Sequence, residues 1–570
     1  RRRDGGMDGN LQFSTVQSNR IAGYTPSGRI GIRTGRWTLT ASGSGSFTPV
    51  AESRFTETRE QAGQPLPFAG RSDSKSRTNY GRGHFSAVFD PTPKHTAGFD
   101  IEYTERSTHM PTLSRTTLGQ TQSDSRYRQH MDGNTLTATA NYIWKIDTLG
   151  SQFKLIADYT RYTSDGDNSY HTTTCAPGTL RDSLYESATG SVYDILTADA
   201  GLTRKLPHGL TLRAGLRYTR NDMADKSRYA AQTQGTWLAL PEYSYDQHYT
   251  EQIGAAYASL EYSAGRWELS AGLRGEYTSV ASQAFGRSYF GLFPNVSVSR
   301  ALNALRTWLL VAQWSRNIER PAFPALNPAR IRISDYSWQS GNPSLRPTYI
   351  HRFSLTAVWK YRYTLTVGGN LHHDLIREIA HRDATAPDAV YIRPENHYTE
   401  NHWFVAASVP AKITRWWNLS VNAVGVMQRI RLNSTDSPAT HYLMFADATC
   451  SFTLPAGFFA EAVYRAQSRL YSGNSEVGPR HTLSATVKKQ LFGKRLTLFC
   501  TLSNITGCDW EFASLTDGMR RTIDTGQAWS GRLWKVGAAW NFRTGKKFRA
   551  RTVESAAETQ RKRLVKSTEQ

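Results

Sequence analysis

Long apolar runs are missing from this sequence of 570 residues. A transmembrane helix needs roughly 18 consecutive apolar residues or more, whereas residues 309–312 (LLVA) are typical of the longest runs here. The chain is therefore not a helical membrane protein. Its mean hydropathy of -0.53 is usual for soluble proteins, but membrane strands that alternate apolar and polar residues also average to a polar value. The missing runs exclude helical membrane proteins but are compatible with a transmembrane β-barrel.

Catalytic and metal-binding motifs are also missing. The sequence has no GxSxG or HExxH motif, and residues 381–383 (HRD) resemble a kinase catalytic loop without its companion motifs. Residues 165–168 (DGDN) resemble a calcium turn that lacks its closing Glu, and an ordinary polar turn is the alternative. Residues 372–374 (HHD) end a predicted strand, where a metal site and an exposed polar rim are the two alternatives. We predict no catalytic residue, no metal, no cofactor and no enzymatic activity.

Cysteine is scarce, with four residues and no CxxC or Cys/His metal spacing. Cys450 and Cys500 fall inside predicted strands, where a cysteine acts as a small apolar side chain. Cys175 and Cys508 fall in predicted loops and could pair in an oxidising compartment. The chain opens on Arg-Arg-Arg-Asp-Gly-Gly, with neither Met nor a signal-peptide pattern. This start indicates a processed product or a segment of something longer.

Acidic residues are outnumbered, and the formal net charge is +22. Such a charge raises the question of nucleic-acid binding. Much of the excess lies at the two ends, in Arg1–Arg3 and in the tail after residue 543, and the rest is spread singly along alternating segments. No basic helix or aromatic-basic RNA motif occurs. We predict no nucleic-acid partner, and we expect the tail to lie solvated or to touch acidic surfaces.

The pattern that is present is strict alternation. Residues 210–218 (LTLRAGLRY) place leucine, alanine and tyrosine on one face and threonine and arginine on the other. Residues 136–146, 267–277, 363–371 and 417–427 repeat this period of two, and their apolar faces end in Trp or Tyr. The segments run about ten to thirteen residues, as a tilted membrane strand requires, whereas soluble sandwich strands average about five or six. The pattern favours a membrane barrel over a soluble sandwich.

The connections alternate as well. Short turns are predicted at residues 34–36, 91–94, 147–150, 207–209, 264–265, 410–413, 455–457 and 491–494, with long polar stretches between them, such as 48–78, 106–133, 163–187, 221–248 and 319–346. Short turns on one rim and long loops on the other are typical of outer-membrane barrels. Counting hairpins predicts an all-β, transmembrane, antiparallel up-and-down barrel of about 22 strands, the number found in plugged transporters.

One loop, residues 316–347, organises the sequence, and we call it the signature loop. Its prolines hold neighbouring residues extended, and a loop of this length is usually functional or disordered. It carries an "RP…LNP…GNPxLxP" motif, which comprises Arg320, Pro321, Leu326, Asn327, Pro328, Gly341, Asn342, Pro343, Leu345 and Pro347. This motif resembles a Bacteroidetes-type outer-membrane β-barrel family, similar to the barrel portion of TonB-dependent receptors. Strand parity predicts that the loop is exposed on the exterior rim.

The C-terminal end agrees with that resemblance. Lys535, Gly537, Trp540 and Phe542 resemble the signal by which the barrel-assembly machinery recognises a final strand. We therefore divide the chain into a barrel, residues 1–543, and a basic periplasmic tail, residues 544–570. The receptors' TonB box and plug have no counterpart in this sequence, so the resemblance implies either the barrel part of a longer receptor or a plugless relative.

The resemblance implies the outer membrane of a Gram-negative bacterium and contact with its lipid. It also implies uptake of a scarce nutrient, of the siderophore, cobalamin, glycan or peptide class. A TonB complex would act only through a plug that this chain lacks, and a plugless porin or structural barrel is the alternative. Two aromatic residues of the signature loop, Tyr336 and Trp338, either face a small-molecule or glycan ligand or pack loop against loop.

Overall fold

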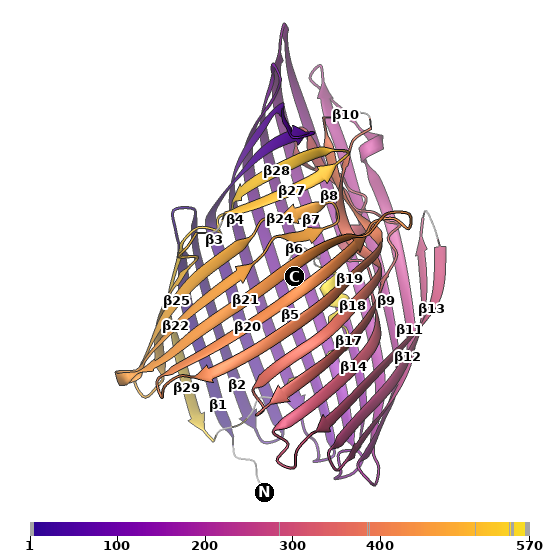
Figure 1. Ribbon diagram of the computed structural model, residues 1–570, viewed down its shortest axis with the longest axis vertical. Helices are drawn as coiled ribbons and strands as arrows, with labels where there is room; N and C mark the ends of the chain where they lie inside the picture. Colours follow the sequence, from indigo (N-terminus) through magenta and orange to yellow (C-terminus); the bar gives the residue numbers. More distant parts are fainter. Residues whose placement is uncertain are drawn as a thin grey trace.

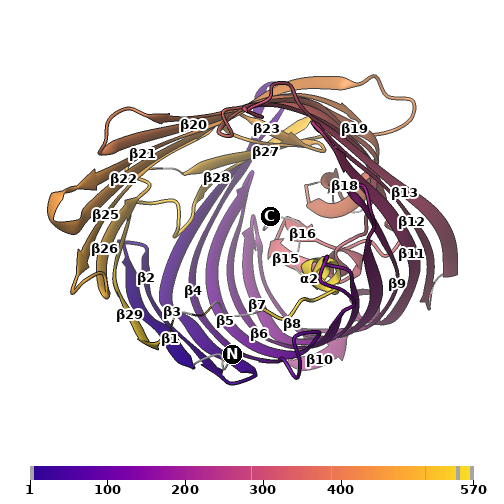
Figure 2. The ribbon, with the colours of Figure 1, turned by 90° about the horizontal axis from the view of Figure 1, so that it is seen from below.

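The computed structural model describes residues 5–283, 286–384, 386, 388–507, 509–546, 548 and 552–564. Twenty-two strands, each hydrogen-bonded to its neighbours, form a closed antiparallel wall (Figures 1 and 2). The predicted fold class is confirmed. None of the helices among the described residues is long and apolar enough to cross a membrane.

The wall strands follow the order of the sequence. They are β1 (Gly6–Gln17), β2 (Ile21–Thr34), β3 (Trp37–Gln61), β4 (Gln64–Phe89), β5 (His95–Leu118), β6 (Thr121–Lys145), β7 (Gln152–Ala176), β8 (Thr179–Lys205), β9 (Leu210–Thr233), β11 (Tyr245–Ala264), β12 (Trp267–Ser282), β13 (Gly286–Ala301), β14 (Trp308–Glu319), β17 (Thr348–Trp359), β18 (Tyr363–Arg382), β19 (Val390–Lys412), β20 (Trp417–Arg431), β21 (Ala439–Leu454), β22 (Phe458–Gln467), β25 (Arg480–Leu491), β26 (Leu496–Ser503) and β29 (Leu533–Gly545).

The remaining elements are short and lie outside this succession. They are the strands β10 (Thr236–Ala239), β15 (Ile331–Ser334), β16 (Ser337–Gln339), β23 (Leu470–Ser472), β24 (Ser475–Val477), β27 (Trp510–Thr516) and β28 (Met519–Gly526), the α-helices α1 (Phe323–Leu326) and α2 (Glu558–Arg561), and the 3-10 helices η1 (Pro241–Tyr243), η2 (Pro455–Gly457) and η3 (Lys562–Leu564).

The barrel closes between its first and last strands. β1 pairs antiparallel with β29 from Gly6 opposite Gly545 to Gln17 opposite Trp534, and β29 also pairs with β26. Closure removes the exposed edges that would leave backbone groups unpaired inside a bilayer. The predicted last strand therefore completes the wall, which is the structural reason for its regular pattern.

The alternation of the sequence separates an outer from an inner face. On β9, Leu212, Leu216 and Tyr218 are exposed on the outside, whereas Thr219 and Asn221 are buried on the inside. The same separation holds around the barrel, because successive side chains of a strand point to opposite faces. The outer face is apolar and the lumen is lined by polar side chains.

The two rims differ, as the sequence predicts. All eight predicted short turns join consecutive wall strands at one end, for example 34–36 between β2 and β3. We call this end the short-turn rim; it lies at the bottom of Figure 1, and both β1 and β29 reach it. We call the other end the long-loop rim. There the prediction of long loops is wrong for β3–β9, because most of the polar stretches extend the strands themselves. Residues 48–78 are not a loop but the outer halves of β3 and β4, joined by a turn at Ala62 and Gly63.

Candidate functional site

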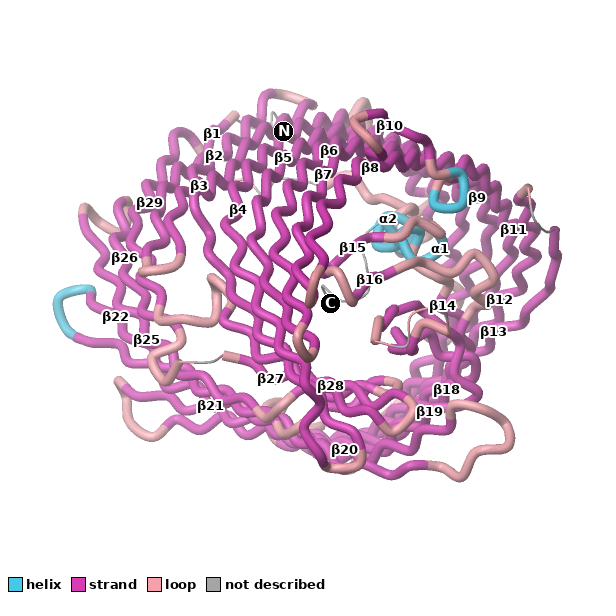
Figure 3. Tube along the Cα trace, turned by 90° about the horizontal axis from the view of Figure 1, so that it is seen from above, coloured by secondary structure: helices cyan, strands magenta, loops and turns pink. Residues whose placement is uncertain are grey.

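The signature loop folds into the barrel. Its first four residues, 316–319, extend β14. The rest leaves the wall after Glu319 and returns at Thr348 of β17, the register partner of Glu319. Between them α1, β15 and β16 lie inside the ring of wall strands (Figures 2 and 3). The loop joins its two strands at the long-loop rim, as strand parity predicts, but the prediction that it is exposed there is wrong, because its apolar residues pack against the inner wall.

Apolar packing holds the first and last parts of the loop. Phe323, Leu326 and Leu345 are 1%, 3% and 0% exposed. They form one core with inward-facing Tyr193, Ile195, Met223, Tyr249 and Val280 of the wall. Burial of each such side chain contributes roughly 1.5–3 kcal/mol to stability. Three of the loop's residues thus account for much of its attachment.

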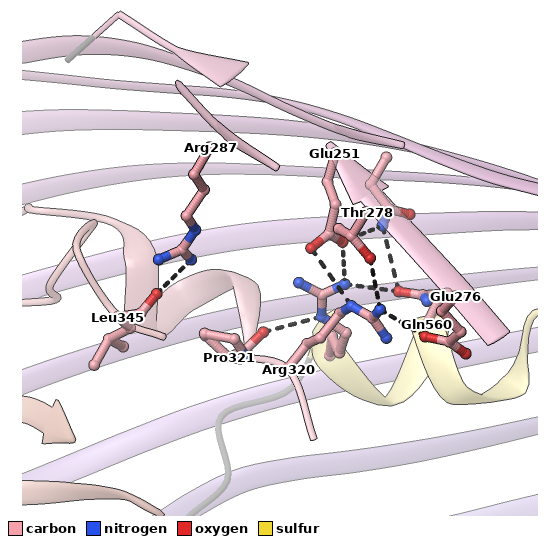
Figure 4. A network of polar contacts seen from close by, with 10 residues as sticks. Glu251, Glu276, Thr278, Arg287, Arg320, Pro321, Leu345 and Gln560 are labelled. Carbon is pink, nitrogen blue, oxygen red and sulfur yellow. Dashed lines mark hydrogen bonds and ion pairs between the residues drawn. The ribbon is translucent and has the colours of Figure 1, made fainter. Parts of the chain in front are cut away.

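Arg320, the first residue of the motif, is anchored in a buried polar network (Figure 4). Its Nη2 donates to Glu276 Oε2 at 2.7 Å and to Thr278 Oγ1 at 2.9 Å, and its Nε lies 3.9 Å from Glu251 Oε1. Burial opposes the positive charge of Arg320, but the acidic groups that face it, including Glu251 and Glu276, outweigh burial and raise its pKa. Arg320 is therefore a permanently charged anchor of the loop.

The C-terminal segment reaches the same network from below. Arg563 Nη1 donates to Glu251 Oε2 and, at 2.8 Å, to Gln560 Oε1; its Nε donates to Pro321 O at 2.9 Å. The Arg563 guanidinium also lies over the ring of Phe323, 4.2 Å from its centroid. Glu251 thus faces two arginines, one from the loop and one from the tail. Such buried charges are tolerated because they are paired.

Further contacts hold residues 552–564 against the wall. Ala556 N donates to Asp158 Oδ2 at 2.7 Å, and Lys154 Nζ forms an ion pair with Glu554 at 2.6 Å. The described part of the tail therefore lies along the inner wall and contacts acidic groups there. Its assignment as a periplasmic segment stays a prediction.

The asparagines and the glycine of the motif shape the loop itself. Asn342 donates its backbone N–H to Ala325 O at 2.7 Å and its side-chain Nδ2 to Pro394 O at 3.0 Å. Asn327 Oδ1 accepts the backbone N–H of Ala329. A Cβ at Gly341 would lie 2.1 Å from Asn327 O, so only glycine fits this close approach. Pro328, Pro343 and Pro347 stiffen the connecting turns.

The tip of the loop docks on the far wall. Asp335 accepts hydrogen bonds from Ser125, from Tyr127 OH at 3.1 Å and from Thr172 Oγ1 at 2.9 Å. Tyr336 packs edge-on against Phe68 with ring centroids 5.8 Å apart. The Arg330 guanidinium lies 5.7 Å from the Trp338 ring. Both aromatics therefore contact the protein itself, and ligand contact by either stays a prediction.

The predicted assembly-signal residues share the closing strand. Trp540 and Phe542 have the outward parity of β29, and Lys535 and Gly537 have the inward parity. A Cβ at Gly537 would lie 2.6 Å from Phe13 O, so a larger residue there would disturb the β1–β29 pairing. Recognition of these residues by the assembly machinery stays a prediction.

The weaker motif candidates fall in regular structure. Residues 165–168 are not a turn but lie inside β7, paired with β6 and β8. His372 lies within β18 and contacts Glu400 O at 2.7 Å. Among the described residues no group of three or more His, Cys, Asp or Glu side chains could hold a metal ion. Cys175 is a free, exposed thiol in β7, and Cys508 lies outside the described residues.

The sequence analysis does not single out the network's wall partners, Asn221, Glu251 and Glu276, or its tail partner, Arg563. The sequence does contain a signal for the two carboxylates, because Glu251 and Glu276 occupy positions of alternating strands that face the lumen. Which inward carboxylate meets which loop arginine depends on the register between strands, and the alternation alone does not give it.

Comparisons with known proteins agree with this architecture. Residues 144–537 match the model of the outer membrane protein beta-barrel family. A search of curated proteins finds no match. Among solved structures, the siderophore receptor PirA from Pseudomonas aeruginosa is 13% identical, with a TM-score of 0.56, and the match covers 94% of this chain and 80% of that one.

Two further solved structures show the same fold. A mutant of the ferric enterobactin receptor PfeA from Pseudomonas aeruginosa, in complex with enterobactin, is 14% identical with a TM-score of 0.59, and the match covers 94% of this chain and 81% of that one. The copper transporter OprC is 11% identical with a TM-score of 0.61, and the match covers 95% of this chain and 81% of that one. At these identities the likeness is one of fold.

Proposed function

Because the chain belongs to the outer membrane protein beta-barrel family, we propose that it is the barrel portion of a TonB-dependent-receptor-like transporter. Its place is the outer membrane of a Gram-negative bacterium. It would take up a scarce nutrient of the siderophore, cobalamin, glycan or peptide class. The motif of the signature loop supports a Bacteroidetes-type member of the family. The solved structures that resemble it are transport proteins, and we assign no catalytic role.

One observation carries this proposal: part of the inner wall binds polypeptide through buried polar groups. Asp158 of β7, Asn221 of β9 and Glu251 of β11 all hydrogen-bond residues of the segment 552–564. A porin wall needs only hydrated side chains. Buried carboxylates instead need partners, because an unpaired buried charge costs several kcal/mol. This part of the wall therefore suits a barrel whose lumen contains a folded segment.

The proposed mechanism follows from that arrangement. A ligand would enter at the long-loop rim, where the signature loop narrows the lumen. Passage would require displacement of luminal polypeptide, energised by the TonB complex through a plug domain carried outside these residues. The assembly machinery would insert the barrel by recognising β29.

The alternative is a plugless porin or structural barrel, and it is favoured insofar as residues 552–564 take up part of the luminal space that a plug domain would need. Two assays on the full gene product separate the two. Retention on the immobilised periplasmic domain of TonB, with no swelling of proteoliposomes in a small neutral sugar, supports the transporter. Swelling as fast as with an open porin control, with no retention, overturns the transporter in favour of the alternative.

A further inference from the structure

A hollow of about 380 Å³ opens on the inner wall at β20, β21, β22 and β25. These strands lie across the lumen from α1 and α2 (Figure 3). Its roof is formed at the base of the hairpin of β27 and β28, with Asn504 and Trp510, the first residue of β27, on one side and Gln527 and Trp529 on the other. The volume lies within the range of roughly 300–1,000 Å³ that small-molecule sites occupy.

The wall contributes two rows of register partners. One row runs Asn422, Asp447, Arg465, Thr482 across the four strands, and the next runs Val424, Phe445, Gln467, Arg480. Register partners on neighbouring strands share a face, so each row presents its side chains side by side to the lumen. The alternate positions Val421, Met444 and Tyr464 are exposed on the apolar outer face. The first row is polar throughout and forms the floor of the hollow.

Most of the polar groups in the hollow have unused hydrogen-bonding capacity. Asn422 is held at both ends of its amide, because its Oδ1 accepts from Ser408 Oγ at 2.6 Å and its Nδ2 donates to Asp447 Oδ2 at 2.9 Å. It therefore orients the Asp447 carboxylate, whose other oxygen has no hydrogen bond within the described part of the chain. Within the described part of the chain, the side chains of Arg465, Gln467, Thr482 and Gln527 have no hydrogen bond or ion pair.

An aromatic surface completes the hollow. Trp529 is 52% exposed although its backbone is held firmly: Asn504 Nδ2 donates to its carbonyl at 2.7 Å. The adjacent Ser530 is buried and donates to Asp509 Oδ1 at 2.8 Å. Trp510 is fixed by the Arg480 guanidinium, 4.4 Å from its ring centroid. A half-exposed indole on a backbone held in place beside free polar groups is suited to stack on a ligand.

The mixture of groups identifies the ligand class. A ligand hydroxyl both donates and accepts hydrogen bonds. The hollow offers acceptors and donors for it: a free carboxylate oxygen, a guanidinium, amides and a threonine hydroxyl. Asp447 offsets the charge of its register partner Arg465, and Arg480 is stacked on Trp510, so the floor offers an anion little net attraction. An apolar ligand would leave the polar floor unsatisfied. A sugar ring has hydroxyls at its edge and an apolar face for the indole. We propose that this hollow is a binding site for a neutral saccharide, an inference that rests on the transporter function above because it names the substrate class.

Binding of the purified, folded full gene product to an array of neutral, sulfated and sialylated glycans and of peptides tests the proposal. We expect binding to neutral glycans, and titration calorimetry with the best of them should give an affinity that falls about tenfold in Trp529→Ala, since stacking is worth a factor of that order. Asp447→Asn should weaken it similarly. The matched control is Trp534→Ala, because Trp534 is also 52% exposed but lies on the outer face of β29.

Three results overturn the proposal: binding of no neutral glycan, binding only of anionic glycans or peptides, or neutral-glycan binding that Trp529→Ala and Asp447→Asn leave unchanged. Heat-modifiable migration on a gel establishes that each variant is a folded barrel, and Trp529→Phe should restore most of the affinity. The outcome is separable from that of the proposed function. Glycan binding without TonB retention supports the site and refutes energised transport, and TonB retention without glycan binding does the reverse.

Discussion

Two stretches of the same inner wall use polar residues in opposite ways. At β9–β12, which we call the closed wall, Asn221, Glu251 and Glu276 are buried and bonded to the signature loop or to residues 552–564. At β20–β25, the open wall, Arg465 and its neighbours face a hollow with free hydrogen-bonding groups. Both stretches follow the same alternation. The difference is whether the chain folds back onto them: polar residues that it covers hold structure, and those left uncovered are available to a ligand.

Removal of the central carboxylate should break the closed wall. We expect Glu251→Gln to reduce the free energy of unfolding by about 3–5 kcal/mol, because Arg320 and Arg563 would stay buried after losing a shared counter-charge. Urea unfolding of the barrel in lipid measures the change. The control is Glu268→Gln, because the Glu268–Arg306 pair is exposed at the short-turn rim and should contribute no more than about 1 kcal/mol. Equal effects of the two variants would contradict the distinction.

The apolar attachment of the signature loop should be nearly as sensitive. We expect Leu345→Ala to cost about 2–5 kcal/mol, because a fully buried side chain leaves a cavity when truncated. Leu305→Ala is the control, since Leu305 lies exposed in a short turn and should change stability by less than about 0.5 kcal/mol. The same urea titration applies. A stability loss below about 1 kcal/mol for Leu345→Ala would mean that the loop is not packed inside the barrel.

The close approach inside the loop allows a smaller, local test. Gly341→Ala should cost about 1–3 kcal/mol through overpacking, because the new Cβ would meet Asn327 O. Proteolysis within residues 320–347 should rise accordingly. At Gly425 a Cβ meets nothing within 4 Å, so Gly425→Ala should leave the cleavage rate unchanged. Equal cleavage of both variants would refute the described backbone contact.

The open wall should show the smallest effect on stability. Arg465→Gln should change the free energy of unfolding by no more than about 0.5 kcal/mol, since its guanidinium has no partner among the described residues. The temperature at which the variant loses heat-modifiable migration on a gel, compared with that of the unsubstituted protein, measures the change in stability. A loss comparable to that of Glu251→Gln would show that the open wall is structural after all.

Much of the barrel is predictable from sequence because its rules are local. Alternation separates lipid-facing Leu216 from inward-facing Asn221, and the short turns mark the strand ends. The number of strands and the fold class follow from these two patterns. The sequence predicts loops for the long-loop-rim halves of β3–β9 because polar residues occupy both of their faces, so that no apolar periodicity marks a strand there.

The candidate sites are less predictable because they depend on distant pairs. The motif indicates that residues 320–347 are important, but Glu251 and Arg563 lie far apart in sequence and meet only because the C-terminal segment folds back against the inner wall. The inward direction of the loop depends on the shape of Phe323, Leu326 and Leu345 against the wall. In the same way, Asn422, Asp447, Arg465 and Thr482 are isolated polar residues in sequence, and only the strand pairing brings them into one row.

The coupling free energy between Glu251 and Arg563 tests most directly whether the closed wall holds residues of the chain itself. A double-mutant cycle with Glu251→Gln and Arg563→Gln, measured by urea unfolding in lipid, compares each single variant with the double. The contact between Arg563 Nη1 and Glu251 Oε2 predicts a coupling of about 1–3 kcal/mol, against a value near zero for the same cycle at Asp447 and Arg465. A coupling near zero between Glu251 and Arg563 would contradict the account.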